Sequence, residues 1–247
     1  MTPILELQDL SFRYEGGLPG EKVLDALTFA VAPGERVGLV GCNGVGKSTL
    51  LKILVGILPI QAGALTVGGL PMERKNLAEI RRKVGYIFQD SDSQLFMPTV
   101  RADVAFAAEN YGYPPEEVAV RTRRALAAVH MEHCADRPVY RLSGGQKKLA
   151  SIAGILTLDP ALILMDEPSA ALDPRNRRAL IGILNALPCA KLIASHDLDF
   201  IYDTCDRVLL LHHGQLAADG PVQEILCDKT LLERCELELP LRWQRDF

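Results

Sequence analysis

A glycine-rich stretch near the start of the chain has the residue types and spacing that bind a phosphate chain. Residues 41–49 read G-C-N-G-V-G-K-S-T, which matches G-x-x-x-x-G-K-[ST]. Small residues let backbone N–H groups converge on phosphate oxygens, and glycines accept the positive φ values that such a loop needs. The Lys47 ammonium would lie beside the β- and γ-phosphates, and the Ser48 hydroxyl would ligate Mg²⁺. We expect nine residues to form this nucleotide-binding loop: Gly41, Cys42, Asn43, Gly44, Val45, Gly46, Lys47, Ser48 and Thr49.

A pair of carboxylates follows a second apolar run. Residues 161–168 read A-L-I-L-M-D-E-P, so Asp166 and Glu167 are expected at the tip of a buried strand. Asp166 would hold Mg²⁺ directly or through water, and Glu167 would act on the attacking water as a general base or a positioning group. The alternative is a solvated acidic turn. The phosphate loop upstream favours the catalytic interpretation.

A third motif, L-S-G-G-Q at residues 142–146, lies about twenty residues before Asp166. A helix that begins with two glycines suggests an anion site. Taken alone, the motif is equally consistent with a helix terminus capped by Ser143.

These motifs need a parallel sheet to bring them together. Short apolar runs predict strands at 36–40, 84–88, 161–165, 191–194 and 208–211, and two earlier strands at 4–14 and 23–31. Helices are expected at 47–55, 98–110, 115–130, 145–156 and 174–187. Residues 53–72 carry no charge, but their prolines and glycines indicate a helix end, a turn and a strand rather than a membrane span. Strands that alternate with helices predict an α/β fold with a largely parallel sheet.

Composition is that of one ordinary globular unit. The chain has 247 residues, of which 48% are hydrophobic and 23% are charged. A net charge of −4 argues against nucleic acid as a partner. The six cysteines form no C-x-x-C pair, so we expect neither zinc nor a disulfide framework, and the N-terminus has no signal-peptide pattern.

The order of phosphate loop, L-S-G-G-Q and acidic strand end resembles the ATP-binding cassette (ABC) family over nearly the whole chain. The resemblance implies ATP and Mg²⁺ as ligands, and the ABC ATPase fold with a P-loop parallel-sheet core, an antiparallel β subdomain and an inserted helical subdomain. Residues 1–247 would form a single ABC ATPase domain. In it, residues 1–89 and 161–247 would form the RecA-like core with the β subdomain, and 90–160 the helical subdomain that carries L-S-G-G-Q.

The resemblance also assigns roles to single residues. Tyr14 is similar to the aromatic residue that stacks on adenine, and Gln89 to the Q-loop glutamine that contacts Mg²⁺ and water. Asp173 resembles the D-loop aspartate, and His196 the switch histidine that senses the γ-phosphate. Two subunits pack head to tail in this family, either as a homodimer or as a heterodimer, so the signature of one chain would close over ATP bound by the other. The signature residues are Ser143, Gly144, Gly145 and Gln146.

One segment is similar to a particular branch of the family. Residues 84–106 read V-G-Y-I-F-Q-D-S-D-S-Q-L-F-M-P-T-V-R-A-D-V-A-F. The ATPases of energy-coupling factor (ECF) importers of cobalt and nickel carry F-Q-x-x-x-x-Q-L-F followed by T-V-x-x-D-V-A-F. The resemblance implies two membrane partners, a transmembrane scaffold protein and a substrate-capture protein, and a location at the cytoplasmic face of the membrane.

An apolar cluster within that segment is a candidate contact with the scaffold. We expect it to help form the groove that receives the scaffold's cytoplasmic coupling helices; the alternative is that it belongs to the core of the helical subdomain. The residues are Gln94, Leu95, Phe96 and Met97. Three other classes compete with an importer subunit: a different ABC transporter such as a vitamin importer or an exporter, a soluble ABC ATPase, and a P-loop kinase or GTPase. The last class has no use for L-S-G-G-Q.

Overall fold

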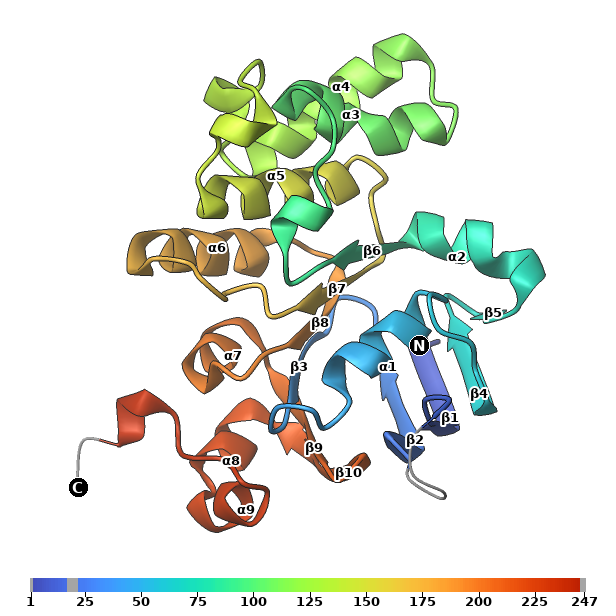
Figure 1. Cartoon of the computed structure of the whole chain (residues 1–247), viewed down its shortest axis with the longest axis vertical. Helices are drawn as coiled ribbons and strands as arrows, with labels where there is room; N and C mark the ends of the chain where they lie inside the picture. Colours follow the sequence, from blue (N-terminus) through green and yellow to red (C-terminus); the bar gives the residue numbers. More distant parts are fainter. Residues whose placement is uncertain (1, 17–21, 245–247) are drawn as a thin grey trace.

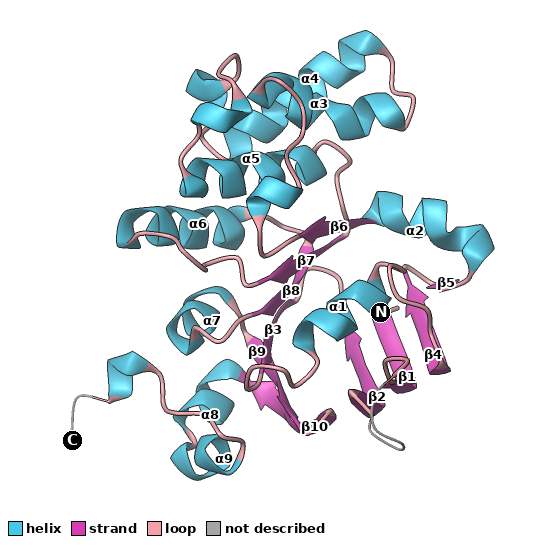
Figure 2. Ribbon diagram, in the orientation of Figure 1, coloured by secondary structure: helices cyan, strands magenta, loops and turns pink. Residues whose placement is uncertain are grey.

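The computed structural model describes residues 2–16 and 22–244, which form two sheets, helices that cover them, and a separate group of helices (Figures 1 and 2). The α/β fold class predicted from the sequence is confirmed.

The smaller sheet is antiparallel and has the order β2-β1-β4-β5. Its strands are β1 (Leu5–Phe12), β2 (Leu24–Val31), β4 (Ala62–Val67) and β5 (Leu70–Pro71). The predicted strand at 4–14 is therefore shorter at its end, because pairing with β2 stops at Phe12. The uncharged stretch 53–72 contains the end of a helix, as expected, and two strands, β4 and β5, where one strand was expected.

The larger sheet has the order β10-β9-β3-β8-β7-β6. Its strands are β3 (Arg36–Val40), β6 (Val84–Ile87), β7 (Leu162–Asp166), β8 (Ala190–Ala194), β9 (Arg207–His212) and β10 (Gln215–Pro221). All neighbouring strands run parallel except β10, which pairs antiparallel with β9. Alternate residues of β7 enter two hydrophobic cores, Leu164 on one face and Met165 on the other. Burial on both faces explains why β7 and β8 read as continuous apolar runs.

Helices flank this sheet (Figure 2). They are α1 (Lys47–Leu54), α2 (Leu77–Lys83), α6 (Pro174–Ala186), α7 (Leu198–Thr204), α8 (Val222–Cys227) and α9 (Lys229–Arg234). Parallel strands end at the same edge of the sheet, so the loops that follow β3, β6, β7 and β8 gather there. This topology brings the phosphate loop, Gln89, Asp166 and His196 to one edge.

Three helices pack against one another beyond β6: α3 (Val100–Asn110), α4 (Pro115–Ala128) and α5 (Gly144–Leu156) (Figure 1, green to yellow). The predicted helix at 98–110 begins later, because the Thr99 side chain caps it by accepting from the Ala102 N–H at 3.3 Å. The division into 1–89 with 161–247 and 90–160 stays a prediction. Over residues 2–16 and 22–244, no helix combines the length and the apolar character that a membrane crossing requires.

Candidate functional site

The phosphate loop joins β3 to α1 through three glycines in backbone conformations that side chains rarely adopt. Their φ values are 157° at Gly41, 82° at Gly44 and 108° at Gly46. A Cβ at Gly41 would lie 2.6 Å from the Leu211 carbonyl oxygen, and one at Gly46 would lie 2.9 Å from the Val23 carbonyl oxygen. Glycine is therefore required at both positions by backbone conformation and by close packing.

Lys47 is the first residue of α1 and lies inside this loop. Its Nζ donates to the Gly41 carbonyl at 2.7 Å and to the Cys42 carbonyl at 3.1 Å. Burial lowers the pKa of Lys47, and the negative charges of Glu167 and Asp166 oppose that shift. The Lys47 ammonium is thus held by carbonyl groups of the phosphate loop, close to the carboxylates of Asp166 and Glu167.

Ser48 and Asp166 place two oxygen donors side by side. The Ser48 Oγ donates to the Asp166 Oδ1 at 3.0 Å. Burial raises the pKa of Asp166, the Ser48 hydrogen bond opposes this shift, and the neighbouring Glu167 adds to it. Burial raises the pKa of the Tyr86 phenol in β6, and the same Asp166 carboxylate, against which the phenol lies, adds to this shift. A hydroxyl next to a buried carboxylate is the kind of oxygen pair that Mg²⁺ binds with phosphate oxygens and water.

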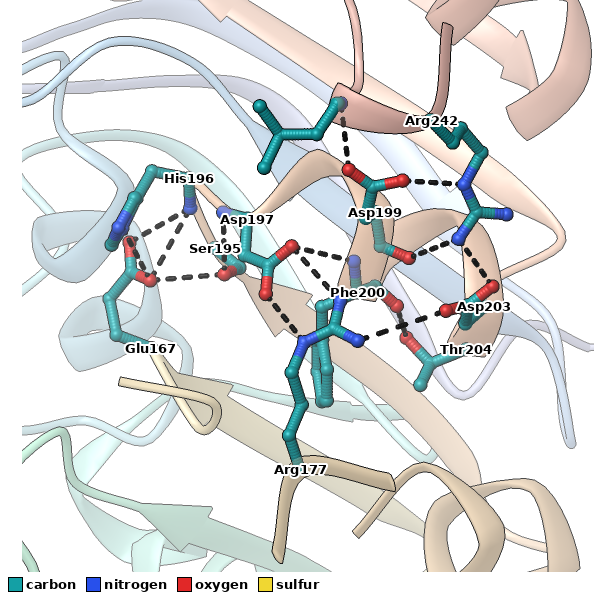
Figure 3. Close-up of polar contacts among 11 residues, drawn as sticks. Glu167, Arg177, Ser195, His196, Asp197, Asp199, Phe200, Asp203, Thr204 and Arg242 are labelled. Carbon is teal, nitrogen blue, oxygen red and sulfur yellow. Dashed lines mark hydrogen bonds and ion pairs between the residues drawn. The ribbon is translucent and has the colours of Figure 1, made fainter. Parts of the chain in front are cut away.

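Glu167 is fixed by the loop that follows β8 (Figure 3). Its Oε2 accepts from the Ser195 Oγ at 3.0 Å and lies 2.9 Å from the His196 Nδ1. The backbone N–H of His196 donates to the Glu167 Oε1 at 3.1 Å. Glu167 has a φ of 46°, an uncommon value for a residue other than glycine, and its side chain is only 10% exposed. The carboxylate is therefore held in one orientation, while the His196 side chain is 62% exposed.

Tyr14 follows β1, and its hydroxyl lies 3.0 Å from the Thr49 Oγ1 at the start of α1. Its ring packs edge-on against Phe12 and remains 47% exposed. An exposed aromatic face next to the phosphate loop suits stacking on a purine.

Gln89 follows β6 and is exposed, and its backbone is tied to helix α5. The Lys148 Nζ donates to the Phe88 carbonyl at 2.8 Å and to the Gln89 carbonyl at 2.9 Å. Burial lowers the pKa of Lys148 to about 8, although the charges of Asp90 and Asp166 favour the ammonium. The helix that carries L-S-G-G-Q thus sets the position where the chain leaves β6.

The L-S-G-G-Q residues form the start of α5. Ser143 caps the helix by accepting from the Gln146 N–H at 3.3 Å, and the Gln146 side chain accepts from the Ser143 N–H at 3.1 Å. Among the described residues, the hydrogen bonds of this motif do not reach the phosphate loop, and Figure 1 shows α5 apart from the loop before α1. Asp173 caps α6 by accepting from the Asn176 N–H at 2.9 Å.

The apolar cluster after Gln89 is divided between core and surface. Leu95 is buried in the core. The Gln94 side chain accepts from the Phe88 N–H and donates to the Tyr86 carbonyl. Phe96 is 64% exposed and packs edge-on against Phe106 of α3 at 4.8 Å between ring centres. Buried Asp103 accepts from the Phe96 N–H at 2.8 Å and from the Met97 N–H at 2.7 Å.

Several residues at the site were not predicted from the sequence. Ser195, Lys148 and Tyr86 contact the expected residues only through tertiary structure. S-H-D as a short run after a strand could have drawn attention to Ser195, whereas nothing in the sequence marks Lys148 or Tyr86. Arg177 of α6, which bonds to Asp197, is another such residue.

Comparisons with known proteins agree with this geometry. A family model described as ABC transporter matches residues 24–170. A Geobacter sulfurreducens protein named as an ABC transporter ATP-binding protein is 45% identical over 241 residues, which cover 98% of this chain and 96% of the relative. The energy-coupling factor transporter ATP-binding protein EcfA of Methanocaldococcus jannaschii is 40% identical, with 96% and 86% of the two chains covered.

A solved structure is also similar over nearly the whole chain. It is cbiO1 from Clostridium perfringens, described as part of the ABC transporter complex cbiONQ. The sequence identity is 33%, the TM-score is 0.85, and the match covers 99% of this chain and 97% of that one.

Proposed function

Since the chain belongs to the ABC transporter family, we propose that its ATP-hydrolysing activity energises an ECF-type importer of a transition-metal cation, cobalt or nickel. The observation that carries the hydrolytic part is the convergence of Lys47, Ser48, Asp166 and Glu167 at one edge of the parallel sheet.

The phosphate loop and Lys47 bind the triphosphate. Backbone N–H groups of the loop and the Lys47 ammonium would bind the β- and γ-phosphates, and the N-terminus of α1 would add its dipole. Tyr14 stacks on adenine. This assignment is supported by the positive φ values of the three glycines and by the burial of Lys47.

Mg²⁺ fits the oxygen pair of Ser48 and Asp166, with the Gln89 side chain as a further ligand. The fit is supported by the 3.0 Å contact between Ser48 Oγ and Asp166 Oδ1. Mg²⁺ takes few protein ligands and completes its shell with phosphate oxygens and water. When bound, Mg²⁺ neutralises charge on the phosphates.

Glu167 accepts a proton from the attacking water, and His196 contacts the γ-phosphate. Glu167 is already oriented by Ser195 and by the His196 backbone, so little reorganisation is needed to align it. The His196 side chain is 62% exposed, which supports its assignment as a contact of the γ-phosphate.

A second ABC subunit, identical or related, completes the site with its signature. Ser143, Gly144, Gly145 and Gln146 cap α5 in the helical group, and their described hydrogen bonds do not reach the chain's own phosphate loop. This separation supports closure over ATP bound by the partner. Asp173, at the start of α6, takes part in the same contact.

The membrane scaffold protein docks an apolar cytoplasmic helix beside Phe96. A hollow of about 220 Å³ lies there, lined by Phe96, Leu95, Phe106 and Ile155, with Arg81 and Arg82 among its lining residues. The exposed edge-on pair of Phe96 and Phe106 supports an apolar anchor. This contact would place the chain at the cytoplasmic face of the membrane, together with a substrate-capture protein.

Purification of the tagged chain from membranes of its own source tests the whole proposal. We expect a membrane scaffold and a capture protein to copurify, and vesicles containing the complex to take up radioactive cobalt or nickel when MgATP is supplied. Phe96→Asp should release the chain from the scaffold, whereas Val120→Asp, at an exposed residue of α4, should not. Copurification of Phe96→Asp at the wild-type level contradicts the docking site. Uptake of a vitamin, or export, contradicts the metal assignment.

A further inference from the structure

Arg177 joins helix α6 to helix α7 through a fork of two hydrogen bonds (Figure 3). Its Nε donates to the Asp197 Oδ2 at 2.8 Å, and its Nη2 donates to the Asp197 Oδ1 at 3.1 Å. The guanidinium also lies 5.5 Å from the centre of the buried Phe200 ring. Both charged side chains are less than one third exposed, at 26% for Arg177 and 29% for Asp197. A bidentate pair with these restraints has a defined geometry, unlike a mobile surface ion pair.

Asp197 follows His196 directly and sets the start of α7. Its side chain accepts from the Phe200 N–H at 2.8 Å, and its own N–H donates to the Ser195 Oγ at 3.1 Å. The Ser195 Oγ in turn donates to the Glu167 Oε2 at 3.0 Å. A continuous series of bonds therefore runs from Arg177 through Asp197 and Ser195 to Glu167.

The backbone of Arg177 is bonded to the residue that caps α6. Arg177 lies in the first turn of the helix, and its backbone N–H donates to the Asp173 carbonyl at 2.9 Å. Asp173 also caps the helix. The segment expected to contact a second subunit is thus one helical turn away from the side chain that holds Asp197.

A second arginine supports α7 from the end of the described chain. Arg242 donates to the Asp203 Oδ1 at 2.7 Å and bonds to Asp199, whose Oδ2 accepts from the Leu241 N–H at 2.8 Å. Asp203 also lies 3.9 Å from Arg177. The two arginines hold α7 between α6 and the segment that contains Arg242 (Figure 3).

We propose that Arg177 is a positioning residue for ATP hydrolysis, which keeps His196 and Ser195 aligned on Glu167 by fixing Asp197 at the start of α7. This inference rests on the proposed roles of Glu167 and His196. Arg177 acts through Asp197 and does not itself contact the nucleotide.

Helices α6 and α7 have contacts other than those of Arg177, so we expect its replacement to test position rather than folding. The side chains of α6 and α7 share one hydrophobic core through Leu180, Leu184 and Phe200. The Asn185 Nδ2 also donates to the Asp203 carbonyl at 3.0 Å. We expect Arg177→Met to keep the packing between the two helices.

Steady-state phosphate release by the purified complex, prepared with each variant in turn, is the main experiment. We expect Arg177→Met to lower kcat by about 10- to 100-fold, with KM for ATP within about twofold of wild type, because misplacement of reacting groups slows the chemical step more than binding. Arg177→Lys, which keeps the charge but not the fork, should give an intermediate kcat. Arg178→Met, at the exposed next position of α6, should behave as wild type.

A second variant keeps the inference testable if Arg177→Met does not fold. Asp197→Asn keeps a good helix cap but removes the charge that Arg177 binds, so it should lower kcat in the same way. In NMR spectra of histidine-labelled protein, the His196 ring signal should shift in Arg177→Met and stay in place in Arg178→Met. A kcat for folded Arg177→Met within twofold of wild type, or an unchanged His196 signal, overturns the inference. Failure of the purified complex with the wild-type chain to hydrolyse ATP would instead contradict the proposed function.

Discussion

Ser48 donates a hydrogen bond to Asp166 at 3.0 Å, although 118 positions separate the two residues in the chain. One follows β3 and the other ends β7, so the parallel sheet is what brings them together. The contact places a hydroxyl from the phosphate loop against a buried carboxylate, next to Lys47 and Glu167. Its consequences for binding and catalysis can be measured one side chain at a time.

Replacement of Lys47 tests its contribution to the binding of the triphosphate. A charge-assisted hydrogen bond contributes about 1.5–3 kcal/mol, so Lys47→Ala should weaken ATP binding roughly 10- to 150-fold. Lys75→Ala, at a side chain that is 76% exposed in a surface pair with Glu73, is the control and should bind ATP normally. Titration of a fluorescent ATP analogue provides the measurement, and equal affinities for the two variants would refute the assignment.

Ser48→Ala tests the magnesium site. The variant loses one of the two oxygens of the pair, so the Mg²⁺ concentration for half-maximal ATP hydrolysis should rise roughly tenfold, equivalent to about 1.4 kcal/mol. Binding of metal-free ATP in EDTA should change little, since the loop backbone and Lys47 are intact. An unchanged Mg²⁺ dependence would remove Ser48 from the metal site.

Two glycine substitutions should change stability in opposite directions. Gly46→Ala forces a Cβ onto a residue with φ 108° and to within 2.9 Å of the Val23 carbonyl oxygen, so we expect a loss of about 1–3 kcal/mol in the free energy of unfolding. Gly182→Ala lies inside α6 with open space around its Cβ and should gain about 0.5–1 kcal/mol. Urea unfolding of both variants provides the comparison. A Gly46→Ala protein as stable as wild type would contradict the strained loop.

Thiol labelling should report nucleotide in the loop. Cys42 is half-buried within the phosphate loop, and MgATP should slow its reaction with a maleimide several-fold. Exposed Cys227 should label at the same rate with or without nucleotide. Burial raises the pKa of Cys205 to about 12, so this thiol should stay unmodified at pH 8 in the native protein. Equal rates at Cys42 in both conditions would show that the nucleotide lies elsewhere.

The sequence predicted the elements whose patterns are local. The strand predicted at 36–40 is found at those residues. A short apolar run between a turn and a glycine loop is too short for a buried helix, so a buried strand is the expected structure. The helix predicted at 174–187 is present as α6, where a proline at its first position and Asp173 before it fix the start. Its last predicted residue, Leu187, lies just outside the helix.

The sequence could not predict the contacts that orient the site. Ser195 donates to Glu167 because β8 lies beside β7 in the sheet. The sequences of the two strands do not indicate that they are neighbours. Lys148 reads as a charged surface residue of a helix, yet it is buried against the carbonyls that follow β6. Short helices such as α7, α8 and α9 also escaped prediction, since six or seven residues show too little periodicity.

The most direct measurement of the central claim compares phosphate release by wild-type chain and Glu167→Gln under saturating MgATP. The substitution keeps the shape of the side chain and the acceptor for Ser195 but removes the base. We expect the variant to bind ATP as tightly as wild type and to hydrolyse it about 100-fold more slowly or worse. Hydrolysis by Glu167→Gln at the wild-type rate would show that the carboxylate held by Ser195 and His196 does not act on the attacking water.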